Sequence, residues 1–374
     1  MLFVLPLMPV RPSAQSAGSD DEGIIFGGAL RFNYNLSSWK EGQVKRAGDF
    51  GYDMFRINAA GKVKGINLNA EYRFYSAGFG GGMLKQGWFG YETGNGSEIQ
   101  LGLNQVPFGI QQYNSHNWFF NLTYYLGFED DHDMGLKYIH DNGMWQLQAA
   151  YYHNAEELVF GDTPASPNRY SYDVVGNNKE SSQINLKALK RMGPGNRLEA
   201  GGSLQGGLLY NLGTGRHGRS WAGALHLELL PAGSSWGFKL QVMSYEFLPE
   251  TLPEDDPRIV EMGAYGAVYN VASAGNIYSF AASHTISIDR RLIDAITLYN
   301  DFAFLDKRDG DFENTFMNVA GGMVASGQVY TYVDLAMGYN HPWLGPEWTD
   351  ALAAGTEGAT GWHLRFNINF GYYF

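Results

Sequence analysis

The sequence of 374 residues contains no cysteine and no long apolar run. The missing cysteine excludes a disulfide scaffold and a thiolate zinc site. Although 44% of the residues are hydrophobic, no window offers the roughly 18 consecutive apolar residues that a transmembrane helix needs. A helical membrane protein is therefore excluded. After residue 23 there is also no Pro/Ser-rich linker or change of composition, so we expect a single large domain.

Basic residues are scarce, because 26 Lys and Arg stand against 38 Asp and Glu, for a net charge of -12. A protein that binds a nucleic-acid backbone needs a basic face, so no nucleic acid is expected as a partner. Local catalytic motifs such as G-x-S-x-G and H-E-x-x-H are missing as well. We therefore predict that the chain is not an enzyme, with no catalytic residue and no cofactor.

What the chain does have is strict alternation of apolar and polar residues, clearest in the last segment, 361–374. One face carries Trp362, Leu364, Phe366, Ile368, Phe370, Tyr372 and Phe374, and the other carries His363, Arg365, Asn367, Asn369 and Tyr373. Such a strand suits a membrane barrel, with lipid outside and water or polar groups inside. Its aromatic carboxy-terminus resembles the terminal strand of bacterial outer-membrane barrels.

Alternating segments of this kind recur from Gly23 onward. We predict about sixteen strands, at 23–36, 51–60, 66–76, 84–92, 98–106, 133–140, 144–154, 181–190, 197–210, 220–230, 236–247, 276–288, 293–305, 315–325, 328–340 and 361–374. Their connections are short and long in turn, as in outer-membrane proteins with short periplasmic turns and long extracellular loops. The sequence thus predicts an all-β protein, a transmembrane antiparallel β-barrel in the bacterial outer membrane.

Residues 1–17 are interpreted as a signal peptide. An apolar run from Leu2 to Val10 precedes small residues where a signal peptidase could cut. The basic n-region is missing, as in a truncated signal, and a buried N-terminal strand is the alternative. Residues 18–374 are assigned to the barrel domain, in which 107–132 is the candidate for an inward constriction loop.

Four arginines are predicted to face the lumen near the seam where the barrel closes. They are Arg31, Arg56, Arg73 and Arg365, on the first, second, third and last strands. Closure is expected to bring Arg365 beside Arg31. Because arginine stays charged, the four would form a basic wall that selects solutes. The alternative is that each arginine pairs with a lumenal carboxylate such as Glu71.

The connection 107–132 begins with Pro107, Phe108 and Gly109, which turn a chain sharply, and leads into the acidic residues Glu129, Asp130, Asp131 and Asp133. Folded inward, it would narrow the pore and set an acidic edge against the basic wall. Folded outward, it would be a solvated acidic loop. The same run with His132 suggests Ca²⁺, which prefers carboxylate oxygens. Because EF-hand spacing is missing, no metal site is predicted.

Several short motifs resemble the phosphate-selective porin family of the porin O and P type. They are L-G-L-N-Q-V-P-F-G at 101–109, G-L-K-Y at 135–138, and S-G-Q-V-Y-T-Y-V-D-L-A-M-G-Y-N at 326–340. The resemblance covers most of residues 23–374. It implies a trimeric sixteen-stranded channel with a P-F-G element before its inward loop, and an anion preference carried by the four arginines. The acidic net charge departs from that family.

The leading hypothesis is an outer-membrane porin that lets small hydrophilic solutes and ions, anions among them, diffuse through a water-filled barrel. Its expected partners are outer-membrane lipid and lipopolysaccharide, the solutes themselves and two further copies of the chain in a homotrimer. Two alternatives stay open. One is an outer-membrane hydrolase whose catalytic residues converge only in space, and the other is a plugged barrel that serves as an adhesin or anchor.

Overall fold

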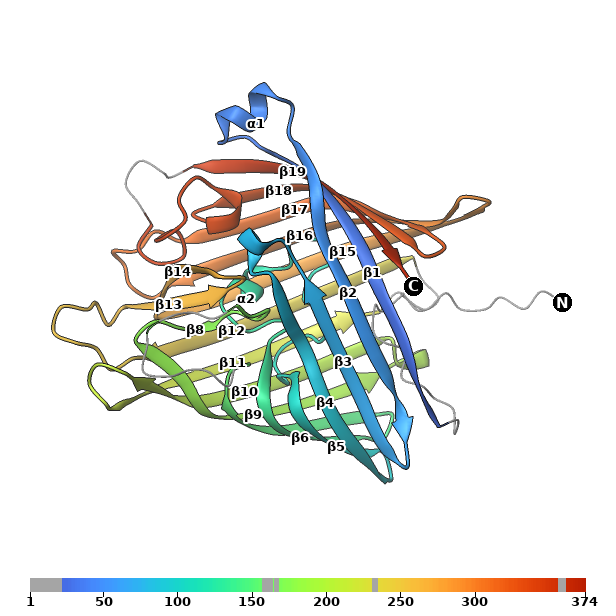
Figure 1. Cartoon of the computed structure of the whole chain (residues 1–374), viewed down its shortest axis with the longest axis horizontal. Helices are drawn as coiled ribbons and strands as arrows, with labels where there is room; N and C mark the ends of the chain where they lie inside the picture. Colours follow the sequence, from blue (N-terminus) through green and yellow to red (C-terminus); the bar gives the residue numbers. More distant parts are fainter. Residues whose placement is uncertain (1–21, 157–163, 165–167, 231–234, 356–360) are drawn as a thin grey trace.

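The computed structural model describes residues 22–374 except 157–163, 165–167, 231–234 and 356–360. The predicted signal segment, 1–17, lies outside the described residues. The described chain forms a closed antiparallel barrel of sixteen strands that pair in chain order (Figure 1). They are β1 (Gly23–Ser37), β2 (Asp49–Val63), β3 (Ile66–Phe74), β4 (Gly82–Gly94), β5 (Ser97–Gln105), β6 (His132–Asp141), β7 (Trp145–Asn154), β9 (Asn178–Met192), β10 (Leu198–Asn211), β11 (His217–Leu229), β12 (Trp236–Leu248), β15 (Ala274–Arg290), β16 (Ile293–Lys307), β17 (Thr315–Ser326), β18 (Val329–Tyr339) and β19 (Trp362–Tyr373).

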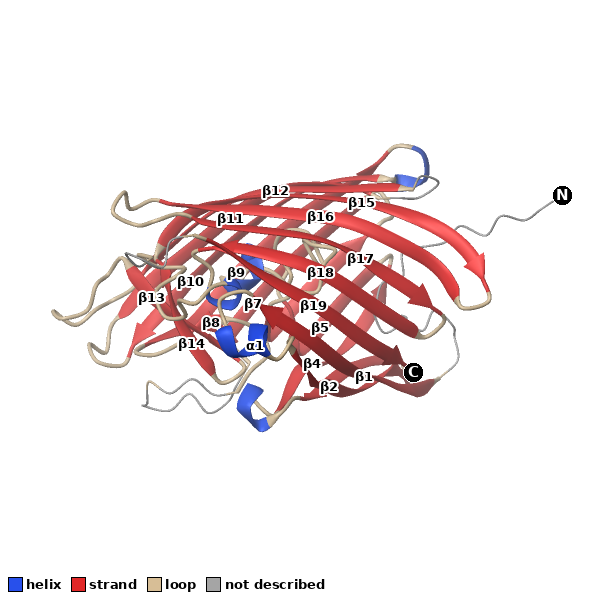
Figure 2. Cartoon of the chain, turned by 90° about the horizontal axis from the view of Figure 1, so that it is seen from above, coloured by secondary structure: helices blue, strands red, loops and turns tan. Residues whose placement is uncertain are grey.

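The sixteen predicted strands are confirmed, and their ends agree with the structure within three residues. The last strand, β19, closes the barrel by pairing with β1, for example Phe32 with Phe370. Closure leaves no open edge in the described barrel wall, where lipid could not satisfy the unpaired amide and carbonyl groups of such an edge. The helices α1 (Glu41–Lys45) and α2 (Leu122–Tyr125) are short (Figure 2). Among the described residues, no helix has the length and apolar character to cross a membrane.

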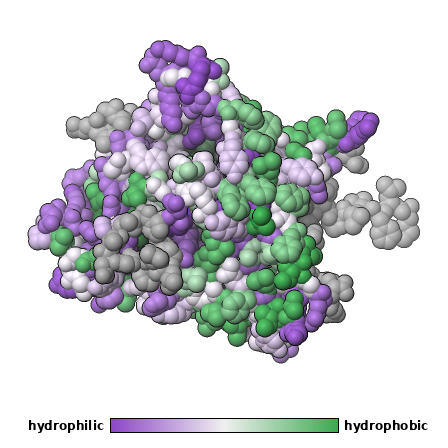
Figure 3. Space-filling model, viewed as in Figure 1, coloured by the Kyte–Doolittle hydropathy of each residue, from purple (hydrophilic) through white to green (hydrophobic). Residues whose placement is uncertain are grey.

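The outer wall of the barrel is apolar because successive side chains of a strand point to opposite faces. On β3, Ile66, Tyr72 and Phe74 are exposed on the outside, whereas Glu71 and Arg73 are buried on the inside. The space-filling view shows hydrophobic side chains gathered over the first strands and hydrophilic ones over α1 and the long loops (Figure 3). In water such a wall would be unfavourable, but in a bilayer it is the expected surface.

Large aromatic side chains mark both ends of this wall. Trp145 and Trp236 begin their strands next to short turns, and Trp362 begins β19 next to a long connection. All three are at least 40% exposed. Amphipathic rings at these heights are typical of the two membrane interfaces.

Inside the end of the barrel that carries the long connections, here called the mouth, lies a second sheet that the sequence did not predict. It consists of β8 (Asp173–Val174), β13 (Ile259–Ala264) and β14 (Ala267–Ala272) (Figure 1). A two-residue turn at Tyr265 and Gly266, both with positive φ, joins β13 to β14, as hairpins require. The connection 248–275, expected as a plain loop, therefore contains a hairpin.

Candidate functional site in the barrel lumen

The connection between β5 and β6 crosses the inside of the barrel. The backbone NH of Ile110 donates to Gln241 Oε1 on β12 at 2.8 Å, and Asn114 Nδ2 donates to Ser279 Oγ on β15 at 2.8 Å. The backbone NH groups of His116 and Asn117 both donate to Asp301 Oδ2 on β16, at 2.7 and 2.9 Å. These strands lie across the barrel from β5, so the segment spans the lumen.

The turn at Pro107, Phe108 and Gly109 sets the course of this segment. All three residues are buried, and the ring of Phe108 packs against that of Phe128 at 5.5 Å. Gly109 has a φ of 56°, and a β-carbon there would lie 2.5 Å from Gln241 Oε1. Glycine is therefore required both by the backbone conformation and by the close approach to the opposite wall.

The acidic residues of this segment do not form an edge facing the pore. Glu129 is buried and accepts from the Asn114 backbone NH at 2.9 Å and the Thr123 hydroxyl at 2.5 Å. Burial raises the pKa of the Glu129 carboxyl to about 7. Asp130 accepts from Lys85 Nζ on β4 at 2.6 Å, whereas Asp131 and Asp133 lie near Asp173 of β8. All four carboxylates are buried against neighbouring protein groups.

The lumen beside this segment holds a cavity of about 560 Å³. All four predicted arginines line it, but none of the four acidic residues does. The loop side presents aromatic rings instead, those of Tyr113, Trp118, Phe119, Phe120, Tyr124 and Tyr125. The cavity therefore lies between a basic wall and an aromatic face, which differs from the expected opposition of basic and acidic edges.

Three of the four arginines are paired with carboxylates of their own wall. Arg31 Nε lies 2.9 Å from Asp53 Oδ2. Glu71 is shared by Arg73 at 2.6 Å and Arg56 at 3.2 Å, and the registers of β2 and β3 place these two arginines directly opposite each other. The alternative of pairing with lumenal carboxylates, with Glu71 as the example, therefore describes these three residues.

Arg365 is held differently. Its guanidinium donates to Asn35 Oδ1 at 3.0 Å and to the Trp343 carbonyl at 3.3 Å, and in the described part of the chain no carboxylate is recorded within ion-pair distance of it. The register pairs Arg365 with Ser37 and Gly371 with Arg31. Arg365 thus lies six residues along the seam from Arg31, roughly 20 Å at about 3.4 Å per residue, and is not beside it as expected.

Among the described residues, the wall consequently carries four guanidiniums and two carboxylates paired with them, Asp53 and Glu71, and keeps a surplus of positive charge. Aromatic rings cover part of it, since Arg31 lies 4.0 Å from the centre of the Trp118 ring and Arg73 lies 4.5 Å from that of Tyr170. Cation–π contacts of this kind stabilise a guanidinium without neutralising it. The wall can therefore attract an anion that enters the cavity.

Two parts of this site were missed from the sequence. One is the set of tyrosines that the other long connections contribute to the cavity, Tyr170, Tyr172 and Tyr265. The other is Asp301, which holds the crossing segment through three donors. The tyrosines carry a weak signal, the Y-S-Y of 170–172, whereas Asp301 looks like any other inward residue of an alternating strand.

A closed sixteen-stranded barrel with an apolar outer wall and a charged, loop-lined interior defines a bacterial outer-membrane β-barrel. Solved structures of that architecture are similar to the chain. The anion-selective porin of Comamonas acidovorans is 13% identical and matches with a TM-score of 0.58 over 95% of this chain and 100% of that one. OmpF of Salmonella typhi in complex with daunomycin is 9% identical, with a TM-score of 0.59 over 94% and 98%.

The trimer form of OmpT, an outer membrane protein of Vibrio cholerae, is 13% identical and has a TM-score of 0.55 over 95% of this chain and 100% of that one. At these identities the likeness establishes the fold, because one fold can host several functions. No family model matches the chain, and no curated protein sequence does either.

Proposed function

We propose that this protein is a passive outer-membrane porin for small hydrophilic solutes and ions, with a preference for anions. The observation that carries the proposal is the cavity of about 560 Å³ bordered by four arginines of which one, Arg365, has no carboxylate partner among the described residues. In a lumen with low-dielectric walls, surplus charge of one sign raises the local concentration of the opposite ion. The crossing segment 107–132 acts as the constriction against which that wall works.

One structural neighbour and one resemblance in sequence support this proposal. The Comamonas acidovorans neighbour is an anion-selective porin, and the motifs at 101–109 and 326–340 resemble phosphate-selective porins. Phosphate is therefore the first anion to try. Arginine suits it because the planar guanidinium can donate two parallel hydrogen bonds to its oxygens.

A homotrimer is part of the proposal. The apolar outer wall can contact lipid, lipopolysaccharide at its outer rim, or another copy of the chain, and OmpT of Vibrio cholerae has a trimer form. Cross-linking of the protein in its native membrane tests this part. A ladder that ends at three copies supports it, and a population that stays monomeric at high cross-linker contradicts it.

A plugged barrel is the second candidate, because one observation favours it. The crossing segment, the small sheet and the end of the long connection after β18 share a buried apolar cluster in the mouth, with Leu126, Tyr172, Met262 and Leu352 each at most 1% exposed. Such a cluster stabilises packed loops. A barrel closed by it would serve as an anchor or adhesin and would pass no solute.

Liposome swelling and planar-bilayer conductance separate these functions. A porin lets liposomes swell in small sugars and shows stepwise conductance in KCl, and phosphate added to that solution should lower the chloride current if it occupies the cavity. A correctly folded barrel that gives neither swelling nor conductance supports the hypothesis of a plugged barrel. The rival hydrolase is tested with a serine-directed covalent probe, and labelling of the folded protein would favour it.

A further inference from the structure

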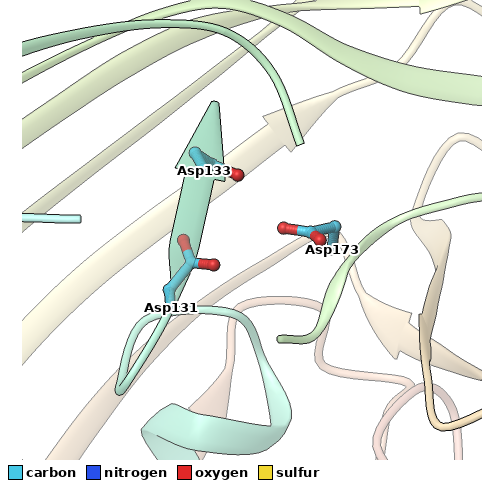
Figure 4. A group of neighbouring side chains, drawn as sticks. All are labelled: Asp131, Asp133 and Asp173. Atoms are coloured by element: carbon cyan, nitrogen blue, oxygen red, sulfur yellow. The ribbon is translucent and has the colours of Figure 1, made fainter. Parts of the chain in front are cut away.

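Three aspartates meet inside the mouth, outside the cavity that the four arginines line. Asp131 ends the crossing segment and Asp133 lies on β6, two residues further on, so both point to one face of an extended chain. Asp173 reaches them from β8, in a different long connection. Carboxylate oxygens of the three lie within 4.8 Å of one another, and their side chains point toward a common space (Figure 4).

These carboxylates are buried and incompletely satisfied. Asp131 is 5% exposed, and Asp133 and Asp173 are 1% exposed. One oxygen of Asp131 and one of Asp133 have no hydrogen-bond partner in the described chain. Burying an ionised oxygen without a hydrogen-bond donor costs much free energy. A ligand that supplies positive charge would remove this cost for the two oxygens.

The side chains around the three aspartates supply too little positive charge to neutralise them. Arg169 Nη1 lies 2.7 Å from Asp173 Oδ2, and Gln183 Nε2 donates to Asp133 Oδ2 at 3.2 Å. Glu156 and Glu180 add further negative charge near Asp131. Lys85 on β4 is already bound to Asp130, the residue before Asp131.

We propose that Asp131, Asp133 and Asp173 together bind one divalent cation of the Ca²⁺ class. Ca²⁺ takes six to eight oxygen ligands at about 2.3–2.6 Å. Two oxygens bound to the same ion can then lie at most about 5 Å apart, and the three aspartates meet that limit without any movement of the backbone. Water completes the coordination.

The ion would fasten the two long connections to each other. Asp173 pairs through its backbone with Gly263, so β8 forms one edge of the small sheet. Binding of its side chain to the ion therefore ties that sheet to β6 and to the end of the crossing segment. An ion at this point stabilises the packed arrangement of the mouth, and its removal loosens that arrangement.

A shared proton is the competing way to neutralise the cluster. Burial, followed by the neighbouring carboxylates, raises the pKa of Asp131 well above its usual range. A protonated carboxylic acid can donate to a second carboxylate and needs no metal. The two explanations differ in their response to Ca²⁺ at a fixed neutral pH.

The test is calorimetric titration of the folded, chelator-treated barrel in detergent with CaCl₂ at pH 7, beside thermal unfolding with and without Ca²⁺. We expect binding of one ion and a higher unfolding temperature with Ca²⁺. Asp173→Asn should weaken the affinity at least about tenfold, the scale on which even supporting groups of metal sites act. Asp311→Asn, on an exposed acidic loop, should leave the affinity unchanged.

Luminescence of bound Tb³⁺, excited through the nearby Tyr152 and Tyr172, gives a second measurement on the unaltered chain. Displacement of Tb³⁺ by Ca²⁺ supports the site. No heat, no thermal shift and no Tb³⁺ signal at millimolar concentrations would overturn it and leave the shared proton. Equal affinity in wild type and Asp173→Asn would overturn it too, because the ions would then sit on surface carboxylates. An increase in conductance after chelation is also expected. That readout alone rests on the proposed channel function, so its failure leaves ion binding standing.

Discussion

The arginine wall and the aspartate cluster are two buried groups of charge in the same lumen, and they are neutralised in opposite ways. In the wall, Glu71 lies between Arg56 and Arg73 and Asp53 pairs with Arg31, so the chain itself compensates part of the charge. In the cluster, Asp131, Asp133 and Asp173 face one another, and Arg169 forms an ion pair with Asp173. A wall that keeps part of its positive charge can attract a passing anion, whereas a cluster of carboxylates with too few cations around it needs a resident ligand.

The most damaging change to the wall should be Glu71→Gln. It keeps the shape of the side chain but leaves Arg56 and Arg73 facing each other without their shared carboxylate. Breaking a buried ion pair from one side is strongly destabilising, and we expect a loss of about 3 kcal/mol in the free energy of unfolding. Urea unfolding of the detergent-folded barrel measures it. A loss well under 1 kcal/mol would mean that water, and not Glu71, screens the two arginines.

The substitution Gln183→Lys should give the aspartate cluster a positive charge of its own, as the carboxylates of the arginine wall have. Gln183 already donates to Asp133, so a lysine there supplies a built-in cation in place of the ion. A ligand at a hundred times its dissociation constant stabilises a protein by about 2.7 kcal/mol, and the variant should lose most of this Ca²⁺-dependent term. Thermal unfolding with and without Ca²⁺ checks it. A variant that still gains stability from Ca²⁺ as the wild type does would speak against the cluster.

Glu129 contrasts with the aspartate cluster, because it is a buried acid of the same segment that has hydrogen-bond donors of its own. Its folded-state pKa is about 7, against an ordinary value of 4.5, so the folded state binds the extra proton between these two values. The resulting stability is fully present below about pH 4.5 and falls as the pH rises through 7. Glu129→Gln should remove that fall, which is on the order of 1 kcal/mol or more.

Unfolding of wild type and Glu129→Gln at pH 5 and pH 8 is the measurement. Thr123→Val is a matched control, since it removes one donor to Glu129 and leaves the carboxyl in place. It should keep the pH dependence. If the wild type is equally stable at both pH values, the carboxyl is ionised throughout and its donors outweigh its burial.

The fold was predictable because each strand of a membrane barrel must alternate between apolar residues that face lipid and polar residues that face the lumen. On β3 and β19 alternation alone distinguishes the faces, and lipid and lumen demand opposite polarity over the full strand length. The small sheet was not predictable in this way. Val260, Met262 and Tyr269 are buried by contacts with distant loops inside the mouth, and no local period records such contacts.

The candidate site was predictable only in part for a similar reason. Inward facing follows from alternation, so the four arginines were identified and they do line one cavity. The positions of the arginines along the barrel axis depend on strand register. The pairing of Arg365 with Ser37 follows from how the first and last strands meet, which alternation does not determine. Asp173 lies in another connection from Asp131, so its position beside the acidic run could not be predicted from the sequence.

The smallest expected effect belongs to Arg365→Gln. Among the described residues Arg365 pairs with no carboxylate, so its substitution leaves no buried negative charge unpaired. The free energy of unfolding should therefore change by no more than about 0.5 kcal/mol. It carries part of the surplus charge, however, and its loss should shift the ion preference modestly toward cations. Reversal potentials beside urea unfolding measure both quantities. A large loss of stability would show that Arg365 is a structural residue held by Asn35 and the Trp343 carbonyl.

The central claim is that the surplus of the arginine wall sets the ion preference of an open channel. Single-channel reversal potentials in asymmetric KCl test it most directly, for the wild type, for Arg56→Glu with Arg73→Glu, and for the exposed turn control Arg291→Glu. We expect an anion-selective wild type, an unchanged control and a double variant shifted to cations. A folded wild type that never conducts would contradict this claim. Equal reversal potentials for the wild type, the double variant and the control would contradict it too.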